Sequence, residues 1–365
     1  MALGFGHTTT VDLERVNTLL EEWGEPAYRR RQVADAAYRG LAATWDDATA
    51  LPRALRARLA DAEPLAELTA TEVQDARDGT IKAGFRTCDG FPVEAVAMRH
   101  RNRRTVCVSS QSGCALACTF CATGAMGLGR NLGAGEISEQ VIVLARMLRE
   151  QGERVSNVVM MGMGEPFMNY DAVLGACRVL NDPDGFGLGA RQIAISTAGW
   201  VPGIERLAAE PLQVKLALSL HAPNDELRGE LMPVTRRYPI ARLMAACRSY
   251  RAATRRRIFV EYLLLDGVND SDRLAAQLGA LLDGGGFHVN LIAYNPTGSD
   301  YRASSPERVA AFAAELQRHG VAASYRRSHG RDIDAACGQL AVRGVRELRR
   351  RRRAAGAAPA QTAPR

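Results

Sequence analysis

The chain of 365 residues contains no apolar run that approaches the roughly 18 residues a membrane-spanning helix requires. Its first residues, Met1 to His7, also lack the basic segment and apolar stretch that are typical of a secretory signal. We therefore expect a cytoplasmic protein without a membrane partner. In that reducing compartment, the eight cysteines are more often metal ligands or catalytic groups than structural disulfides.

A fourth metal ligand is missing beside three closely spaced cysteines. Cys114, Cys118 and Cys121 follow the spacing Cys-x3-Cys-x2-Cys, and no further Cys or His occurs before Cys177. A zinc site normally has four ligands. Three thiolates can instead hold three irons of a [4Fe–4S] cluster and leave the fourth iron open to a substrate or cofactor. The motif, with Phe120 before its last cysteine, resembles the radical S-adenosylmethionine (SAM) superfamily, in which SAM fills the open position.

The positive charge of the chain is clustered. The net charge at pH 7 is +7, and basic residues gather in five short segments. These segments are Arg29 to Arg31, Arg99 to Arg104, Arg255 to Arg257, Arg326 to Arg327 and Arg349 to Arg353. One such cluster is commonly a solvated surface, whereas five clusters on a positive chain indicate a polyanionic partner. Charge alone does not distinguish RNA from DNA.

The two ends of the chain differ in composition from its centre. Apolar residues recur at helical spacing in residues 10–22, 30–41 and 52–62. We expect residues 1–85 to form a helical accessory domain, followed by linker strands as far as residue 103. The tail, residues 343–365, is rich first in Arg and then in Ala, Pro, Gly, Gln and Thr. This composition cannot bury a core, so we expect the tail to be disordered.

Strand-like and helical segments alternate between residues 104 and 342. Apolar, β-rich runs occur at residues 105–109, 157–161, 192–197, 214–220, 258–264 and 289–293. Amphipathic stretches lie between them, for example residues 137–148 and 274–282. Six β–α alternations predict parallel strands with right-handed crossovers. The predicted fold class is α/β, a partial (β/α)6 radical SAM barrel with a small helical amino-terminal domain.

Chemistry in such barrels gathers at the carboxyl ends of the strands. The cysteine loop follows the first strand, and the second is followed by Gly164-Glu165-Pro166, which looks like the superfamily motif that contacts the amino group of SAM. Glycine lets backbone approach a ligand closely, and a carboxylate or carbonyl can accept from an ammonium group. Later strands also end in residues that could hold SAM, although such residues often end strands without a ligand. They are Ser196, Ser219, Leu220, His221 and Asn295.

Two further cysteines, Cys107 on the first strand and Cys337 far downstream, extend the resemblance. Their flanking segments, together with Arg130 to Leu132 and Ala217 to Ala222, are similar to segments of the RlmN family, whose relative is Cfr. The likeness covers roughly residues 85–342 and extends more loosely to the helical module. These families methylate adenosine in RNA, so the resemblance implies a radical SAM RNA methyltransferase.

The resemblance implies a mechanism that suits an electron-poor ring carbon. Carbon-2 of adenine has no lone pair with which to attack a methyl group directly. In the family, one SAM first methylates a cysteine, here Cys337, because a thiolate is a natural acceptor. A second SAM then yields a 5′-deoxyadenosyl radical, which converts the S-methyl group to a methylene radical that adds to the ring. Cys107 matches the thiol that releases the product as a transient Cys107–Cys337 disulfide. Glu94 matches the family's proton acceptor, and both Glu94 and Cys107 remain candidates for the base.

The remaining roles also come from the resemblance. The SAM contacts are Gly164, Glu165, Ser196, Ser219, Leu220, His221 and Asn295. The substrates are an adenosine of 23S ribosomal RNA near the peptidyl-transferase centre and an adenosine beside certain tRNA anticodons. The helical module and the basic clusters would bind the RNA phosphates. A flavodoxin or ferredoxin would supply electrons to a monomeric enzyme.

Three alternatives remain open at this point. A Cfr-like enzyme would methylate carbon-8 of the same adenosine with the same cysteines. A non-catalytic, zinc-stabilised RNA-binding protein would need no SAM. A radical SAM enzyme acting on a protein or metabolite would leave Cys107, Cys337 and the basic clusters without a shared purpose.

Overall fold

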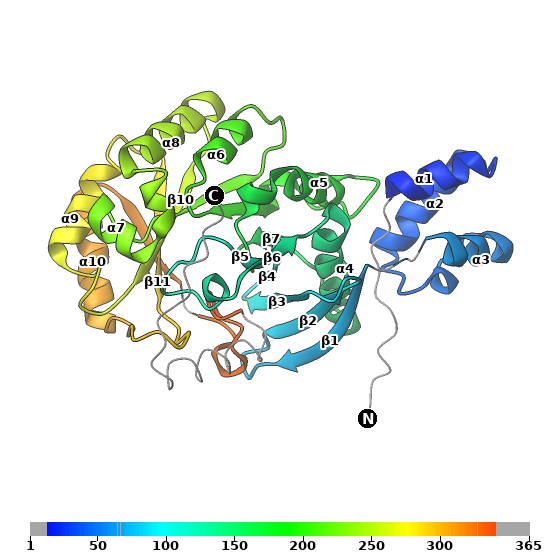
Figure 1. Cartoon of the computed structure of the whole chain (residues 1–365), viewed down its shortest axis with the longest axis horizontal. Helices are drawn as coiled ribbons and strands as arrows, with labels where there is room; N and C mark the ends of the chain where they lie inside the picture. Colours follow the sequence, from blue (N-terminus) through cyan, green and yellow to red (C-terminus); the bar gives the residue numbers. More distant parts are fainter. Residues whose placement is uncertain (1–12, 64, 66, 327, 341–365) are drawn as a thin grey trace.

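The computed structural model describes residues 13–340 except 64, 66 and 327. The predicted basic tail, including Arg349 to Arg353, lies outside the described residues. One sheet of ten strands, in the order β1-β2-β3-β4-β7-β8-β9-β10-β11-β12, organises the described chain. Figure 1 shows this sheet at the centre, with helices against it.

Seven neighbouring strands of the sheet run parallel to one another. They are β4 (Arg103–Cys107), β7 (Asn157–Met160), β8 (Ile193–Thr197), β9 (Lys215–Ser219), β10 (Ile258–Leu264), β11 (Phe287–Ala293) and β12 (Ala322–Arg326). The first six correspond to the six predicted strands. The sheet ends at β1 and β12, so the barrel is open. The predicted partial barrel is confirmed.

The sheet continues beyond the barrel through three antiparallel strands. They are β1 (Leu68–Asp75), β2 (Ile81–Thr87) and β3 (Pro92–His100). β2 and β3 are therefore part of the main sheet rather than linkers, because β3 pairs directly with β4. β1 was not expected, since residues up to 85 were assigned to a helical module. It lies at the edge of the sheet, and charged side chains on its exposed positions weaken its apolar pattern.

Seven helices alternate with the parallel strands. They are α4 (Ala134–Glu150), α5 (Tyr170–Asn181), α6 (Val201–Ala208), α7 (Asp225–Leu231), α8 (Ile240–Thr254), α9 (Asp272–Leu281) and α10 (Pro306–Arg318). Side-chain caps fix where some of these helices begin: Ser271 accepts from the amide of Leu274, and Ser305 accepts from the amide of Arg308. The main core lies between these helices and the sheet.

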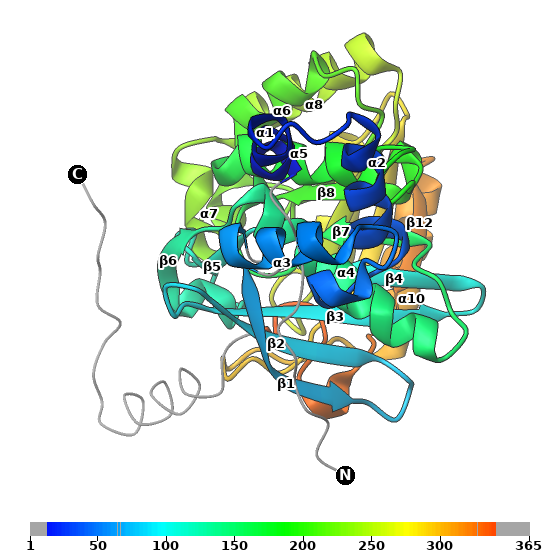
Figure 2. The same ribbon diagram turned by 90° about the vertical axis from the view of Figure 1, so that its right-hand side faces the viewer.

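The amino-terminal helices form a separate small core that docks on α4. They are α1 (Leu13–Glu22), α2 (Tyr28–Ala34), a π-helical turn (Asp35–Arg39) and α3 (Arg53–Ala62). Their core includes Ile142 and Ala145 of α4. Arg146 of α4 donates to the carbonyls of Leu41 and Ala42, each at 2.9 Å. Figures 1 and 2 show this module on the outer side of α4. None of the described helices is both long and apolar enough to cross a membrane.

Candidate active site

The three-cysteine loop is part of a small hairpin beyond the carboxyl end of β4. Its strands are β5 (Gln111–Cys114) and β6 (Gly127–Asn131). Two glycines make the tight path possible. Gly113 has a φ of 80°, and a Cβ there would collide with the carbonyl oxygen of Gly127. A Cβ on Gly124 would lie 3.0 Å from the amide nitrogen of Cys118. The loop therefore holds its cysteines through close backbone packing.

The thiols of the loop share one electrostatic environment. Burial, together with the nearby charges of Cys121 and Glu165, raises the pKa of Cys114 to about 12. Burial also raises the pKa of Cys118 well above its ordinary value, as do the charges of Cys121 and Cys114, while Arg228 lowers it. Three thiolates can coexist here only when a cation compensates them.

The donor set fits an iron–sulfur cluster. In the part of the chain that the structure describes, no three His, Cys, Asp or Glu side chains are arranged to hold a single metal ion. Cluster ligands are spaced more widely than those of one ion, because each thiolate binds its own iron. Soft thiolate ligands are the usual partners of iron–sulfur clusters. Cys114, Cys118 and Cys121 would hold the cluster.

The segment that carries Cys337 packs directly on the cysteine loop. The amide of Ala122 donates to the carbonyl of Gly338 at 2.8 Å. The hydroxyl of Thr123 donates to the carbonyl of Leu340 at 2.5 Å. The last described residues are thus bonded to the residues that follow Cys121, and this places Cys337 beside the loop.

Cys107 and Cys337 come together from distant parts of the sequence. Cys107 is the last residue of β4 and packs in a small buried cluster with Ala335 and Leu340. Burial raises the pKa of Cys107 far above its ordinary value, and the charge of Cys337 raises it further. Solvent reaches Cys337, yet desolvation by the surrounding protein raises the pKa of its thiol, and so does the charge of Glu261. Both cysteines are free thiols.

Glu94 lies on the same face of the sheet as Cys107. Val96 of β3 pairs with Cys107 of β4, and Glu94 is two residues before Val96 on the same strand. The Glu94 carboxylate is buried, and its Oε1 lies 3.8 Å from the Nζ of Lys82. The structure therefore brings Glu94 and Cys107 to one face, together with a lysine that was not anticipated from the sequence.

The Gly164-Glu165-Pro166 segment forms a tight turn that is braced by its own carboxylate. Glu165 accepts from the amide of Ala198 at 2.7 Å and from the amide of Phe167 at 3.1 Å. Its own amide donates to Gln111 at 2.8 Å. Burial raises the pKa of Glu165 to about 7, against the lowering effect of these donors. The carboxylate thus ties the ends of β7 and β8 together, and Gly164, with a φ of 103°, allows the turn.

Ser196, Ser219, Leu220 and His221 lie at adjacent strand ends. The hydroxyls of Ser196 and Ser219 are 3.3 Å apart. Leu220 is fully buried, and His221 has a φ of 59°. The Nδ1 of His221 accepts from the amide of Leu263 at 3.0 Å, so its proton resides on Nε2. Burial lowers the pKa of His221 to about 3, which keeps the ring neutral.

Asn295 presents an unsatisfied acceptor at the end of β11. The residue is buried, and its Oδ1 has no hydrogen-bond partner among the residues that the structure describes. Its Nδ2 makes long contacts with the carbonyls of Ala293 (3.4 Å) and Cys337 (3.5 Å). A buried polar atom without a partner is costly in a protein alone and fits a site that receives a donor from a ligand. This observation agrees with a nitrogen-bearing cofactor such as SAM.

Arg228 was missed by the sequence analysis. Its side chain is completely buried on α7, and its guanidinium donates to the carbonyls of Leu220 (3.1 Å), Ala198 (2.6 Å) and Ser219 (3.3 Å), and to the hydroxyl of Thr235 (2.8 Å). It therefore holds the backbone in place at the carboxyl ends of β8 and β9. The segment Asp225–Leu231 reads as an exposed polar helix, so only the folded structure identifies this role.

A polar row across three strands was also missed. Glu261 of β10 pairs with Asn290 of β11, and Asn290 pairs with Ser324 of β12. Asn290 donates to Glu261 at 2.8 Å, and Ser324 donates to Asn290 at 3.0 Å. Burial raises the pKa of Glu261. A glutamate inside an apolar β-strand was the sequence signal that could have identified this row.

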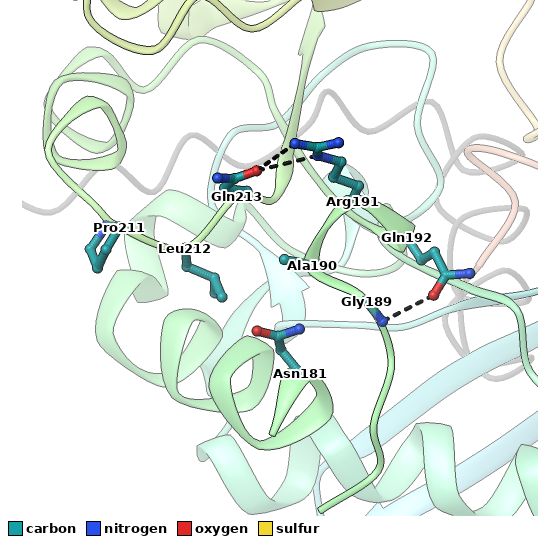
Figure 3. Close-up of a pocket in the computed structure, with 8 residues that line it drawn as sticks. All are labelled: Asn181, Gly189, Ala190, Arg191, Gln192, Pro211, Leu212 and Gln213. Atoms are coloured by element: carbon teal, nitrogen blue, oxygen red, sulfur yellow. Dashed lines mark hydrogen bonds between the residues drawn. The ribbon is translucent and has the colours of Figure 1, made fainter. Parts of the chain in front are cut away.

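A hollow of about 500 Å³ lies at the opposite edge of the sheet (Figure 3). It is lined by residues at and before the amino-terminal ends of β8 and β9. Its charged side chain, Arg191, donates to the side-chain oxygen of Gln213 at 3.0 and 3.2 Å. The carboxyl ends of the strands, with the cysteines, face away from this hollow. It is therefore not the active site.

Comparison with known proteins agrees with this geometry. Residues 108–278 match the Radical SAM superfamily. A probable dual-specificity RNA methyltransferase RlmN of Chloroflexus aurantiacus is 51% identical over 345 residues, which cover 91% of this chain and 92% of the relative. The chain belongs to the RlmN family. The similarly named protein of Symbiobacterium thermophilum is 48% identical over 340 residues, with 92% and 91% covered.

A solved structure supports the same assignment. The radical SAM methyltransferase of Sphaerobacter thermophilus is 52% identical and superimposes with a TM-score of 0.88 over 93% of this chain and 99% of its own. Family membership makes the chain a SAM-dependent methyltransferase and implies a [4Fe–4S] cluster together with SAM. The zinc-stabilised, non-catalytic alternative is thereby set aside. The superfamily match ends before Cys337.

Proposed function

We propose that the enzyme methylates carbon-2 of an adenosine in RNA through an S-methylcysteine at Cys337. The proposed substrates are 23S ribosomal RNA, in the peptidyl-transferase region, and the anticodon-adjacent adenosine of tRNAs. The names of the relatives, which describe a dual-specificity RNA methyltransferase, support an RNA substrate. The observation that carries the proposal is the meeting of Cys107 and Cys337 beside the cysteine loop.

The two cysteines would have different roles, Cys337 as methyl acceptor and Cys107 as the thiol that releases the product. Cys337 is the residue of the pair that solvent reaches, so it is suited to accept a methyl group and then meet the RNA. Its thiol must lose a proton before it can attack a methyl donor. Cys107 is buried behind it and, once its own proton has been removed, would attack the Cys337 sulfur. The disulfide would form as the bond from that sulfur to the methylene carbon breaks, with its electron pair passing to the released base. Per turnover, one SAM would donate the methyl group and a second would be consumed with the cluster, which together supply a hydrogen-abstracting radical.

Glu94 is the better candidate for the base. The buried Cys107 thiol has a strongly raised pKa, so it holds its proton at neutral pH and is a poor acceptor of another group's proton. Glu94 lies on the same face with a cation 3.8 Å from its carboxylate. A positioned carboxylate can take the ring proton when the adduct presents it at hydrogen-bond distance.

Residues at the strand ends would hold SAM. The open Oδ1 of Asn295 can accept from the exocyclic amino group of an adenine or from an ammonium group. Ser196 and Ser219 offer two neighbouring hydroxyls suited to a ribose. Glu165 already accepts two backbone amides, so we propose that it shapes the turn at Gly164 and approaches the ligand through backbone. Leu220 and His221 would line the adenine or ribose.

The helical module and the basic clusters would position the RNA. Tyr28 is 56% exposed on α2, and the guanidinium of Arg29 lies 4.9 Å from the centre of its ring. An exposed aromatic ring beside arginines is suited to unstacked bases and phosphates. The target adenosine must leave its stack to reach Cys337. A flavodoxin or ferredoxin would supply electrons to the monomeric enzyme.

The test uses anaerobically reconstituted enzyme and defined fragments of ribosomal RNA and tRNA. Nuclease digests are compared by mass spectrometry with 2-methyl- and 8-methyladenosine standards. The proposal expects 2-methyladenosine, which Cys337→Ala abolishes and Cys88→Ala preserves, because Cys88 is an exposed thiol outside the site. Formation of 8-methyladenosine would instead assign the Cfr-like reaction. Methylation by Cys337→Ala at the normal rate would refute the S-methylcysteine route.

A further inference from the structure

The chain has almost no lysine, yet one of its lysines is buried. Arginine accounts for all but two of the 47 basic residues, and the two lysines are Lys82 and Lys215. Lys82 is the second residue of β2, the strand next to the edge strand β1, and is 7% exposed. Lysine is seldom buried unless it is paired. Its partner is Glu94 on β3, with 3.8 Å between Nζ and Oε1.

The strand register places this pair on the catalytic face. Lys82 is paired with Val96, and Val96 is paired with Cys107, so the three side chains form one row across β2, β3 and β4. Val96 and Cys107 belong to the small cluster that packs against Ala335 and Leu340. The Lys82–Glu94 pair therefore occupies the face of the sheet on which the Cys337 segment lies.

The opposite face of the same strands is apolar where it packs on the main core. Ala83, Ala95 and Val106 alternate with the row just described and belong to the main core. The fold thus has an apolar core on one side and a buried charge pair on the other. A buried ion pair is weak support for stability, because desolvation of both charges offsets their attraction. A functional role therefore explains the buried pair better than a contribution to stability does.

We propose that Lys82 is a positioning residue that keeps the Glu94 carboxylate ionised and aimed at the ring proton of the adduct. This inference rests on the proposed function. In the step concerned, the proton of the ring carbon moves to Glu94, and the electron pair of the C–H bond remains in the adduct.

The charge of Lys82 is what allows Glu94 to act. A carboxylate buried without a cation favours its neutral, protonated form, which cannot accept a proton. A compact ammonium group supplies the charge without the planar fork of a guanidinium, which would demand a second acceptor in this crowded layer. A lysine supplies this single compact charge, which explains why one of the chain's two lysines stands here.

The experiment measures the covalent protein–RNA adduct rather than product alone. Lys82→Met should form 5′-deoxyadenosine and S-methylated Cys337 as the unaltered enzyme does, yet resolve the adduct about 10–100-fold more slowly, because it weakens a base whose complete loss costs about 10²–10⁴-fold. Denaturing gels should therefore show the adduct accumulating. Lys82→Arg, which restores the charge, should recover part of the rate. Lys215→Met is the matched control, since Lys215 is half-buried on β9 and outside the site, and it should resolve the adduct normally.

A double-variant cycle separates this role from a purely structural one. Lys82→Met should have no further effect on resolution in a Glu94→Gln background, because both changes disable the same step. The double variant removes both buried charges, so it keeps the test valid if Lys82→Met alone folds poorly. An equal slowing by Lys82→Met in both backgrounds would overturn the inference, as would normal resolution by Lys82→Met. If the unaltered enzyme forms no adduct and no methylated RNA, the proposed function itself fails.

Discussion

Replacement of Arg228 by methionine tests whether the strand ends depend on one buried guanidinium. Arg228 donates four hydrogen bonds and is completely buried. Burial lowers its pKa to about 10, so the group is still charged at neutral pH. Methionine fills a similar volume but leaves the carbonyls of Leu220, Ala198 and Ser219 without this donor.

The expected loss follows from opposing contributions. Each hydrogen bond from a charged group contributes about 1.5–3 kcal/mol, so four bonds amount to at most about 6–12 kcal/mol. Burying the guanidinium costs several kcal/mol, which the variant recovers. The net decrease in the free energy of unfolding should be about 3–5 kcal/mol, as for other buried charged groups that lose a partner. That is a large share of the 5–15 kcal/mol typical of a domain.

The assay is denaturant unfolding of the cluster-free protein, with iron content after reconstitution as a second measurement. Iron content should fall in Arg228→Met, because Arg228 also stabilises the thiolate of Cys118. Arg248→Met is the control, since Arg248 is exposed on α8 and makes one surface hydrogen bond; its loss should cost less than about 1 kcal/mol. A decrease below about 1 kcal/mol in Arg228→Met would refute the reasoning.

Three further changes test other parts of the site. Gly113→Ala should prevent iron binding, because its Cβ would collide with the carbonyl of Gly127, and iron analysis checks this. As the pH falls from 6.5 to 5, His221 should contribute a loss of about 2 kcal/mol to the free energy of unfolding of the cluster-free protein, because its pKa, about 3 when folded, lies below its unfolded value and the unfolded state takes up the proton first. Glu165, whose pKa of about 7 lies above its unfolded value, should contribute a gain of similar size over the same range, so the loss is measured as the difference between the unaltered protein and His221→Gln. Thr123→Val should cost about 1–3 kcal/mol by leaving the Leu340 carbonyl unpaired, and should make Cys337 react faster with a thiol reagent.

Each of these changes has its own control. Gly127, like Gly113, has a positive φ (75°), but a Cβ at this position would have no atom within 4 Å. Gly127→Ala should therefore lower the free energy of unfolding by only about 1–2 kcal/mol and still bind iron. Relative to the unaltered protein, His221→Gln should gain about 2 kcal/mol of stability as the pH falls from 6.5 to 5, and an identical pH profile in the two proteins would show that His221 does not titrate as expected. An unaltered rate of Cys337 modification in Thr123→Val would show that the hydrogen bond does not restrain the segment.

The barrel could be predicted from the sequence because its signals are local. The run 258–264 is predicted and observed with the same ends, since a buried parallel strand is continuously apolar apart from Glu261. The predicted helical stretches 137–148 and 274–282 fall on α4 and α9, whose apolar stripes face the core. The edge strand β1 was missed because its alternation is interrupted and its charged residues face solvent.

The candidate site could be predicted only in part. The cysteine loop is visible as spacing, and the pairing of Cys107 with Cys337 came from resemblance, since no local pattern connects residues so far apart. Arg228 and Lys82 were missed for a common reason: a charged residue in a polar helix or an edge-side strand looks like surface until tertiary packing buries it. Burial of charge depends on the whole fold and leaves little trace in a single sequence.

The hydrogen bonds from Ala122 and Thr123 to Gly338 and Leu340 have a consequence for biosynthesis. All the strands of the described residues, and the three thiols proposed to hold the cluster, leave the ribosome before Cys337 does. A messenger with a premature stop just ahead of that codon would still encode the complete sheet and every cluster thiol, but not the cysteine beside them. Translation therefore delivers Cys337, the proposed methyl acceptor, only after the described sheet and the cysteine loop have been made.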